Sequence, residues 1–182
     1  MVCIQIDGQI QLVSFGLNDT DVLHTLISEN RTHLDSWLRW TAAVQSPEQV
    51  ASLIQSFMEK EIIEDGFHAG IWYEGNLVGG LVCHYINRLS HKAEIGYWLA
   101  QSAVGKGIIR RCCLSVLALL FEQEQLHRVE IQAAVENRRS RSVAEALGLR
   151  FEGIKRESEW INGQYMDHAV YSILAQEWAQ TK

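Results

Sequence analysis

The feature that most constrains this chain is a glycine turn, Gly105-Lys106-Gly107, which stands between an apolar run and a long helical pattern. Apolar residues in that pattern recur at the spacing of one helix face; they are Ile109, Cys112, Cys113, Val116, Leu117 and Leu120. The first turn of a helix presents unpaired backbone N–H groups and the positive end of the helix dipole. Glycine has no Cβ to hold the backbone away from an anion. The turn therefore predicts a helix start that binds phosphate.

Two common phosphate-binding motifs do not fit this turn. The dinucleotide-binding pattern G-x-G-x-x-G would require its third glycine at Arg110. The ATP-binding loop would require a glycine at Ala100 and a Ser or Thr at Gly107. Taken alone, the turn is equally compatible with an ordinary helix start, so the nature of the ligand depends on a second motif.

That motif lies downstream, where a strand pattern over 129–135 reaches Asn137, a short helix ends at Gly148, and another strand follows. The glycine turn, this N-x-x-S-x-x-V-x-x-x-L-G segment and Trp37-Leu38-Arg39-Trp40 together resemble the GNAT superfamily of N-acetyltransferases. The nearest branch is the RimL/RimJ type, which acetylates the N-termini of ribosomal proteins. The resemblance covers the whole chain. One departure is Ser102, where the superfamily's Q/R-x-x-G-x-G/A pattern expects Gln or Arg, and this weakens one expected contact near the pyrophosphate.

The periodicity of the chain predicts one domain, 1–182, with a mixed α/β fold and a largely antiparallel sheet. The expected strands cover 3–6, 9–15, 67–73, 77–86, 91–99, 128–135, 150–160 and 164–174. The expected helices are one capped by Asn18 or Asp19, one from Pro47 to about Glu64, one from the glycine turn to about Gln125, and 138–147. Turns are expected at Asp7-Gly8, Glu74-Gly75-Asn76 and Asn162-Gly163, and a bulge or close backbone approach at Gly79-Gly80. The resemblance implies that the strands 91–99 and 128–135 splay apart and admit the pantetheine arm of the cofactor.

Composition limits the partners. The net charge of −6 argues against a nucleic-acid-binding surface and suits a cationic acceptor such as an amine. Four cysteines, Cys3, Cys83, Cys112 and Cys113, form no metal pattern and are expected to be small packed hydrophobic residues in a reducing compartment. Because the chain shows no targeting signal and no apolar run of 18 residues, we expect a cytoplasmic protein that does not bind a membrane. We also expect no bound metal.

The resemblance implies acetyl-CoA as the cosubstrate. Backbone N–H groups of the glycine turn would hold its pyrophosphate, and the Arg110 guanidinium could pair with phosphate, although Arg110 could also be a solvated helix residue. Free N–H groups around Gly96 to Leu99 would face the thioester carbonyl. The expected cofactor-binding residues are Trp98, Leu99, Val104, Gly105, Lys106, Gly107, Ile108, Ile109, Arg110, Asn137 and Ser140.

Asn137 and Ser140 could simply cap the helix that they open. The resemblance favours a catalytic role, with Asn137 bonded to pantetheine or substrate and the Ser140 hydroxyl facing the departing sulfur. It also points to Glu159 as the base, whereas Glu94 is a second candidate, and either could be an ordinary strand carboxylate. His33, His84 and His168 receive no role, since lone histidines are more often structural.

Trp37 and Trp40 could pack in the core or, with Glu94 and Glu159, contact the acceptor. The resemblance favours a protein N-terminal amine as acceptor, on a ribosomal protein that begins with Ser. A small amine (a polyamine, amino sugar or antibiotic) is the alternative within the same fold. A non-catalytic acyl-CoA-binding module is the alternative from another class. The segments 150–160 and 164–174 could form a homodimer interface.

Overall fold

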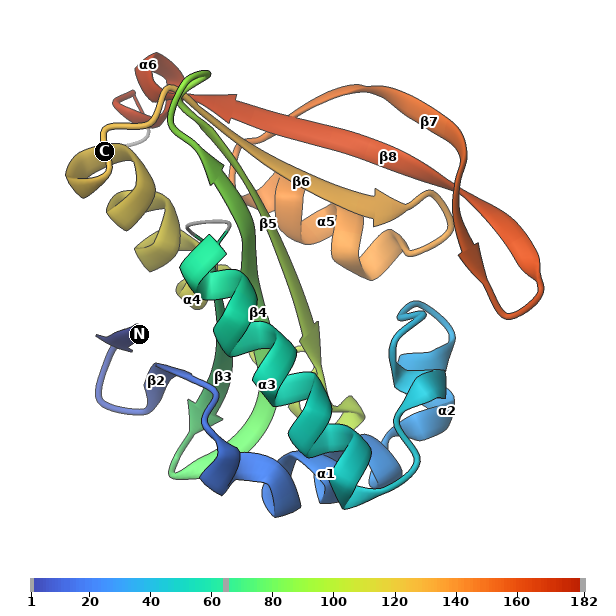
Figure 1. Ribbon diagram of the computed structural model, residues 1–182. Coiled ribbons are helices and arrows are strands. Elements are labelled where there is room, and N and C mark those ends of the chain that lie inside the picture. Colours follow the sequence, from blue (N-terminus) through green and yellow to red (C-terminus); the bar gives the residue numbers. More distant parts are fainter. Residues whose placement is uncertain (1, 64–65, 181–182) are drawn as a thin grey trace.

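The computed structural model describes residues 2–63 and 66–180, which build one eight-stranded sheet with helices on both faces (Figure 1). The sheet order is β1-β2-β3-β4-β5-β6-β8-β7. Its strands are β1 Cys3–Gln5, β2 Ile10–Ser14, β3 Phe67–Tyr73, β4 Asn76–Asn87, β5 Lys92–Leu99, β6 Arg128–Ala134, β7 Arg150–Ile161 and β8 Gln164–Leu174. Within the described ranges β5 and β6 are the only parallel pair. The predicted mixed α/β fold with a largely antiparallel sheet is therefore confirmed.

The helices are α1 Thr20–Glu29, α2 Arg31–Asp35, α3 Pro47–Ile63, α4 Ile108–Ala118, α5 Arg138–Ala146 and α6 Ala175–Trp178. The sequence did not predict the two shortest, α2 and α6. The long helix after the glycine turn was predicted to reach about Gln125, but α4 ends at Ala118 and gives way to a π-helical turn, Leu119–Gln123. The predicted end of the second helix near Glu64 lies outside the described residues.

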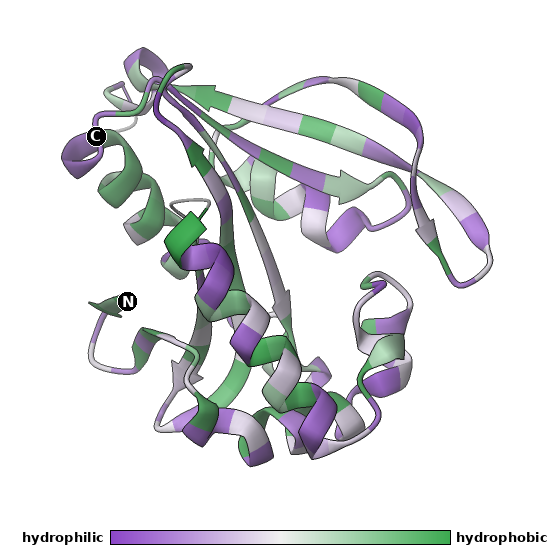
Figure 2. Ribbon diagram, in the orientation of Figure 1, coloured by the Kyte–Doolittle hydropathy of each residue, from purple (hydrophilic) through white to green (hydrophobic). Residues whose placement is uncertain are grey.

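Two apolar cores hold these layers together. The larger core contains α4, the buried side of α5 and one face of the sheet. The second contains α1 and α3 against Phe15, Leu77 and the indoles of Trp72 and Trp98. Figure 2 shows the same division, since α4 is largely apolar whereas polar and apolar residues alternate along α3. Cys83, Cys112 and Cys113 are buried in the larger core, as predicted for small hydrophobic residues, whereas the prediction is wrong for Cys3, which is exposed on the edge strand β1.

Two predicted local features are confirmed in detail. At the start of α3, the Gln49 side chain accepts hydrogen bonds from the main-chain N–H groups of Gln45 and Ser46, at 2.7 and 3.1 Å. The turn between β7 and β8 has positive φ at both Asn162 (51°) and Gly163 (78°), which is the geometry of a two-residue hairpin. Short-range sequence signals therefore located these boundaries correctly.

The parallel pair β5–β6 is incomplete. It extends only over Lys92–Ile95 and Arg128–Ile131, and the remaining residues of the two strands do not pair with each other. Gly96–Leu99 still pair with β4, so β5 follows β4 while β6 follows β8. The predicted splay is thus confirmed, and it opens the sheet at one end.

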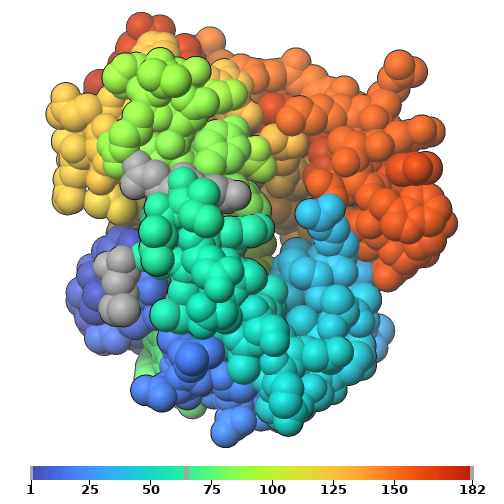
Figure 3. Space-filling view, viewed as in Figure 1, coloured from blue at the N-terminus to red at the C-terminus, as the bar shows by residue number. Residues whose placement is uncertain are grey.

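The β7–β8 hairpin bends towards α2 (Figure 1). A register shift between Lys155 and Glu159 leaves the residues between them without β8 partners. Beyond this bulge, the Asn162 amide donates a hydrogen bond to the main-chain oxygen of Asp35 at 2.7 Å. Figure 3 shows the surface hollowed between α3, the α2 region and this hairpin. The end of the hairpin therefore reaches over the opening that the splay creates.

In the part of the chain that the structure describes, no helix combines the length and the apolar character needed to cross a membrane. The cytoplasmic location stays a prediction.

Candidate active site

A cavity of about 740 Å³ occupies the splay. It runs from the glycine turn, past the unpaired ends of β5 and β6, to the α2 region and β8. The residues that line it are His33, Leu34, Trp37, Leu38, Tyr97, Trp98, Leu99, Ala103, Val104, Gly105, Gly107, Ile108, Ile109, Arg110, Gln132, Ala133, Ala134, Glu136, Asn137, Arg138, Arg139, Ser140, Ser142, Val143 and His168. Two predicted motifs far apart in the sequence, the glycine turn and the Asn137–Ser140 segment, therefore meet in one cavity.

One end of the cavity suits an anion. Gly105 and Gly107 have φ of 84° and 70°, and Gly107 precedes the first residue of α4. Nothing lies within 4 Å of the position that a Cβ would take at either glycine, so the backbone there is open to a ligand. Three arginines are among the residues that line the same cavity: Arg110, Arg138 and Arg139. This donor set fits a phosphate-bearing group such as that of CoA.

Two residues of the turn have other positions than their motif suggests. The Lys106 ammonium lies 5.5 Å from the centre of the Tyr73 ring, and the side chain is not part of the cavity lining. Its predicted role therefore depends on its main chain. Ser102, which stands where the superfamily expects Gln or Arg, is exposed and also outside the lining. Arg110 does line the cavity, and its Nε donates to the main-chain oxygen of Ala146 at 3.5 Å.

The apolar middle of the cavity depends on Trp98. Its indole lies edge-on to that of Trp40, with ring centres 5.7 Å apart. A Cβ at Gly80 would lie 2.5 Å from the Trp98 indole nitrogen, and one at Gly79 would lie 2.2 Å from the Trp98 main-chain oxygen. The predicted close approach at Gly79-Gly80 is thus confirmed, because these glycines make room for Trp98.

The two tryptophans predicted near the acceptor occupy different places. Trp37 lines the cavity. Trp40 packs behind Trp98 in the second core and is not part of the lining. Core packing therefore accounts for Trp40, and a contact with the acceptor remains a prediction for Trp37.

Of the two roles that the sequence left open for Asn137 and Ser140, the structure confirms capping for Asn137, and the catalytic role stays a prediction for both. Asn137 caps α5, since its Oδ1 accepts a hydrogen bond from the main-chain N–H of Ser140 at 3.1 Å. Both residues also line the cavity. The Ser140 hydroxyl lies 3.4 Å from that of Tyr97, which donates to the Ser140 main-chain oxygen at 2.9 Å. Burial raises the pKa of Tyr97, so this phenol stays protonated at neutral pH.

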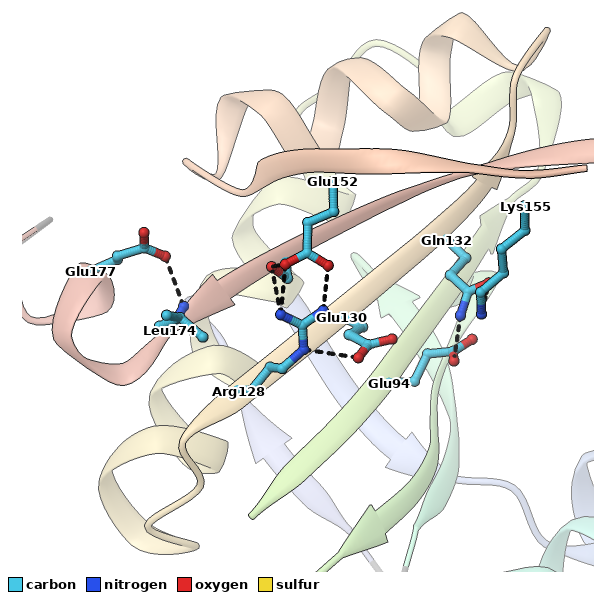
Figure 4. A network of polar contacts seen from close by, with 9 residues as sticks. Glu94, Arg128, Glu130, Gln132, Glu152, Lys155, Leu174 and Glu177 are labelled. Atoms are coloured by element: carbon cyan, nitrogen blue, oxygen red, sulfur yellow. Dashed lines mark hydrogen bonds and ion pairs between the residues drawn. The ribbon is translucent and has the colours of Figure 1, made fainter. Parts of the chain in front are cut away.

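Glu94 lies behind the cavity wall rather than in it. The Gln132 amide lines the cavity and donates to a Glu94 carboxylate oxygen at 2.8 Å, while Lys155 donates to the Gln132 oxygen at 3.1 Å (Figure 4). Burial raises the pKa of the Glu94 carboxyl, an effect that Lys155 partly offsets. Glu94 therefore orients Gln132, and through it the cavity surface.

Glu159 is also outside the lining. Its carboxylate lies 3.6 Å from the Arg39 guanidinium, in an ion pair that solvent can reach. This pair and the Asn162–Asp35 hydrogen bond join the hairpin to the α2 region. The structure therefore brings Asn137 and Ser140 together with the glycine turn, but it places Glu159 at the rim.

Several lining residues were not selected from the sequence: His33, Tyr97, Gln132, Arg138, Arg139 and His168. A signal existed for the arginines, which directly follow Asn137 at the start of a helix. Tyr97 and Gln132 lie at the ends of the two strands predicted to splay. Nothing in the local sequence distinguishes His33 or His168.

Comparison with known proteins gives a consistent result. The family described as acetyltransferase (GNAT) domain matches residues 9–150. Over 183 residues, the whole of both chains, the sequence is 36% identical to YdaF of Bacillus subtilis (strain 168), a protein provisionally named a ribosomal N-acetyltransferase. It is 30% identical over 169 residues to the ribosomal-protein-serine acetyltransferase of Escherichia coli (strain K12), covering 93% of this chain and 94% of the relative.

A similar solved structure is that of the microcin C7 self-immunity acetyltransferase MccE, in complex with acetyl-CoA and AMP. It superposes with a TM-score of 0.88 at 26% identity and covers 94% of this chain and 95% of that one. The fold around the cavity is thus one in which a relative binds acetyl-CoA.

Proposed function

This chain belongs to the GNAT acetyltransferase family, and we propose that it transfers an acetyl group from acetyl-CoA to the N-terminal amine of a protein, a ribosomal protein that begins with Ser being the leading acceptor. The observation that carries this proposal is the single cavity that joins the glycine turn and three arginines to the unpaired ends of β5 and β6. The two relatives named for ribosomal proteins support the choice of acceptor.

On the donor side, the main chain of 105–109 and the side chains of Arg110, Arg138 and Arg139 would hold the phosphates of CoA. The pantetheine arm would follow the slot between Trp98 and Ala133, where the facing edges of β5 and β6 have no strand partner. Acetyl-CoA supplies an activated thioester. The edge of β5 beyond Ile95 would present main-chain N–H groups to its carbonyl oxygen.

In the transfer, the neutral amine nitrogen forms a bond with the acetyl carbon and the carbon–sulfur bond breaks. The sulfur leaves as a thiolate and takes up the proton that the nitrogen loses on becoming an amide. Ser140 and Asn137 line the cavity beside this slot. We assign the Ser140 hydroxyl to donate a hydrogen bond to the departing sulfur, with Tyr97 holding the Ser140 main chain in place.

On the acceptor side, the substrate would enter between the α2 region and the β7–β8 hairpin. Glu159 at the rim would attract a cationic amine, and Trp37 and Gln132, which Glu94 orients, would form its walls. An α-amino group has a pKa near 7.7–8.0, so roughly a tenth of it is neutral at pH 7, whereas a lysine amine is almost entirely charged. An N-terminal amine therefore needs less help from a base.

A small amine is the second candidate, because the similar MccE structure holds AMP, a small molecule, beside acetyl-CoA. To separate the two, the purified protein is given acetyl-CoA with a peptide that begins with Ser, with the same peptide carrying a blocked N-terminus, or with spermidine or an aminoglycoside. Acetylation of the unblocked peptide alone supports the proposal. Turnover confined to a small amine would reject the protein acceptor.

Donor binding is tested by thermal unfolding with acetyl-CoA, with ATP and NADH as controls. A ligand at 100 times its Kd raises the free energy of unfolding by about 2.7 kcal/mol. For a chain of this length we expect a rise in Tm of roughly 5–10 °C with acetyl-CoA only. An equal rise with ATP would contradict a cradle specific for CoA.

We further propose that the protein is a homodimer that uses the β7–β8 hairpin. β7 is an edge strand of the sheet. The hairpin exposes four large apolar side chains, those of Phe151, Ile154, Trp160 and Tyr165, each more than half exposed. Sedimentation equilibrium at micromolar concentration would show a dimer, and Trp160→Glu would shift it to a monomer. A monomeric wild-type protein would disprove the interface.

A further inference from the structure

His168 lines the cavity but has no role in the proposed chemistry. It lies on β8 opposite Ala134, at the end of β6 where the splay is open. His168 lines the same cavity as Ser140, Asn137 and Gln132. The side chain is half-buried. It is therefore within the site and still accessible from it.

The bulge in β7 fixes the orientation of this imidazole. The three residues of β7 between Lys155 and Glu159 have no β8 partners, and Glu157 has a φ of 50°. The Glu157 N–H donates to Asp167 Oδ1 at 2.7 Å, which anchors the bulge to β8. The Ser158 hydroxyl then lies 3.1 Å from His168 Nδ1. Bulges beside active sites commonly redirect one side chain, and this one directs Ser158 towards His168.

Among the described residues, His168 Nε2 has no hydrogen-bonding partner. A histidine whose Nδ1–H is held by an acceptor carries its lone pair on Nε2, the atom that can accept a proton. The Ser158 hydroxyl oxygen lies within hydrogen-bonding distance to be that acceptor, which corresponds to the Nδ1–H tautomer of His168. In that tautomer, Nε2 is oriented and free to accept a proton.

We propose that His168 is the general base of the transfer, with Ser158 as its positioning residue; the proposal rests on the function proposed above. His168 Nε2 takes one proton from the acceptor ammonium, which leaves a neutral amine and an imidazolium. The amine then forms the nitrogen–carbon bond as the carbon–sulfur bond breaks, and the further proton that the nitrogen loses on becoming an amide passes to the departing thiolate. The imidazolium afterwards releases its proton to solvent.

The two carboxylates are less well placed for this step. Glu159 is paired with Arg39 and lies outside the cavity lining. Glu94 reaches the cavity only through the Gln132 amide, which is bonded to it. Imidazole as a class changes charge near neutral pH, which suits a base for an α-amino group. The other charged or titratable groups beside His168 or in the same cavity are Lys155, Glu157, Asp167, Glu136, His33, Arg110, Arg138 and Arg139.

The test compares four variants with the wild-type protein: His168→Ala, His168→Gln, Ser158→Ala and Glu159→Gln. The rate kcat is measured from pH 5.5 to 9 with saturating acetyl-CoA and a Ser-start peptide, or spermidine if that is the accepted amine. We expect both His168 variants to lose about a hundredfold in kcat and to lose the rising limb of the pH profile. Free imidazole should restore part of the rate in His168→Ala, where it finds space, and not in His168→Gln.

The Ser158→Ala variant should shift the rising limb and lower kcat less than the His168 variants do. Calorimetric titration should show an unchanged Kd for acetyl-CoA in all four, which separates loss of the base from loss of the fold. His24→Gln, on α1 and outside the cavity lining, is the matched control and should retain the wild-type profile.

The proposal is overturned if His168→Ala keeps the rising limb of the wild-type kcat–pH profile, or if Glu159→Gln is the only variant that loses this limb. It is also overturned if free imidazole restores none of the rate lost in His168→Ala. Failure of the wild-type protein to acetylate any peptide or amine would instead reject the proposed function. The two failures are therefore distinguishable.

Discussion

The hydroxyl of Tyr97 donates a hydrogen bond to the main-chain oxygen of Ser140 at 2.9 Å, and so joins the two sides of the splay. Tyr97 comes from β5 and Ser140 from the first turn of α5, 43 residues apart in the sequence. β5 and β6 are not paired at the level of Tyr97, so the Tyr97 side chain forms a connection there in place of the main-chain hydrogen bonds of the sheet. We expect this hydrogen bond to fix the width of the slot.

Removing this hydroxyl should weaken both the fold and the donor site. We expect Tyr97→Phe to lower the free energy of unfolding by about 1 kcal/mol, the usual net value of one such hydrogen bond, and to raise the Kd for acetyl-CoA. Urea unfolding and calorimetric titration measure the two effects. Tyr85→Phe, which alters a tyrosine on β4 outside the cavity lining, is the control. An unchanged Kd in Tyr97→Phe would show that the link does not set the slot.

Gly80 makes room for the Trp98 indole, so a methyl group there should be costly. Gly80→Ala would place a Cβ 2.5 Å from the indole nitrogen, and we expect a loss of about 1–3 kcal/mol in the free energy of unfolding together with weaker acetyl-CoA binding. Gly8→Ala is the matched control, because nothing lies within 4 Å of its Cβ position. Similar stability of the two variants would mean that Trp98 can move aside at little cost.

His68 should make stability depend on pH. Burial, with smaller contributions from His84 and Lys60, lowers the pKa of His68 from 6.5 to about 4, and its ring stacks on Phe57 with centres 4.1 Å apart. Between these two pH values the unfolded chain binds more protons than the folded one, so the free energy of unfolding falls as pH drops from 6.5 towards 4. Because the side chain is partly exposed, we expect a loss on the order of 1–2 kcal/mol.

Urea unfolding of the wild-type protein and His68→Gln at pH 7 and pH 4.5 measures this contribution. The variant should lose less stability on acidification than the wild-type protein does. His24→Gln, a histidine on α1, controls for the loss of one imidazole from the chain. Equal acid sensitivity of His68→Gln and the wild-type protein would assign the effect to other groups.

Asn30 connects the acceptor side to the donor side. Its Oδ1 accepts a hydrogen bond from the main-chain N–H of Gln101 at 2.8 Å, at the start of the short turn that leads to Gly105. We expect Asn30→Ala to raise the Kd for acetyl-CoA by about three- to tenfold, since a hydrogen bond of this kind contributes roughly 1 kcal/mol. Gln101→Ala keeps the same N–H and should bind like the wild-type protein. Equal Kd values for acetyl-CoA in the two variants would show that Asn30 does not contribute to the donor site.

The sequence located most elements because their signals are local. The Gln49 capping interaction and the Asn162-Gly163 turn depend on residues within four positions of each other, and both were predicted. The helices α2 and α6 were missed because five and four residues are too short for a hydrophobic period to be recognised. The β7 bulge was missed because it depends on the Asp167 side chain of a different strand.

The candidate site divides in the same way. The glycine turn and the Asn137–Ser140 segment were found from sequence, since each is a short motif of characteristic residue types at fixed spacing. The resemblance of both motifs to one family then predicted that they bind the same cosubstrate. The sequence left two roles open for Trp40 and for Glu159; the structure places Trp40 in the second core and pairs Glu159 with Arg39 outside the cavity lining. Strand alternation and helix spacing predict which residues share one face of an element, but they do not predict which other segments pack against that face.

By itself, the sequence therefore determined the order of the strands and of the four longer helices, and the position of the glycine turn. These follow from backbone preferences and apolar periodicity over short distances, whereas the splay was expected from the family resemblance alone. Only the tertiary structure decided which side chains share the cavity, namely that Tyr97 reaches Ser140, that Gln132 stands in front of Glu94, and that His168 faces the splay. The physical reason is that a cavity is formed by packing between distant segments, and its surface depends on how all of them fit together at once.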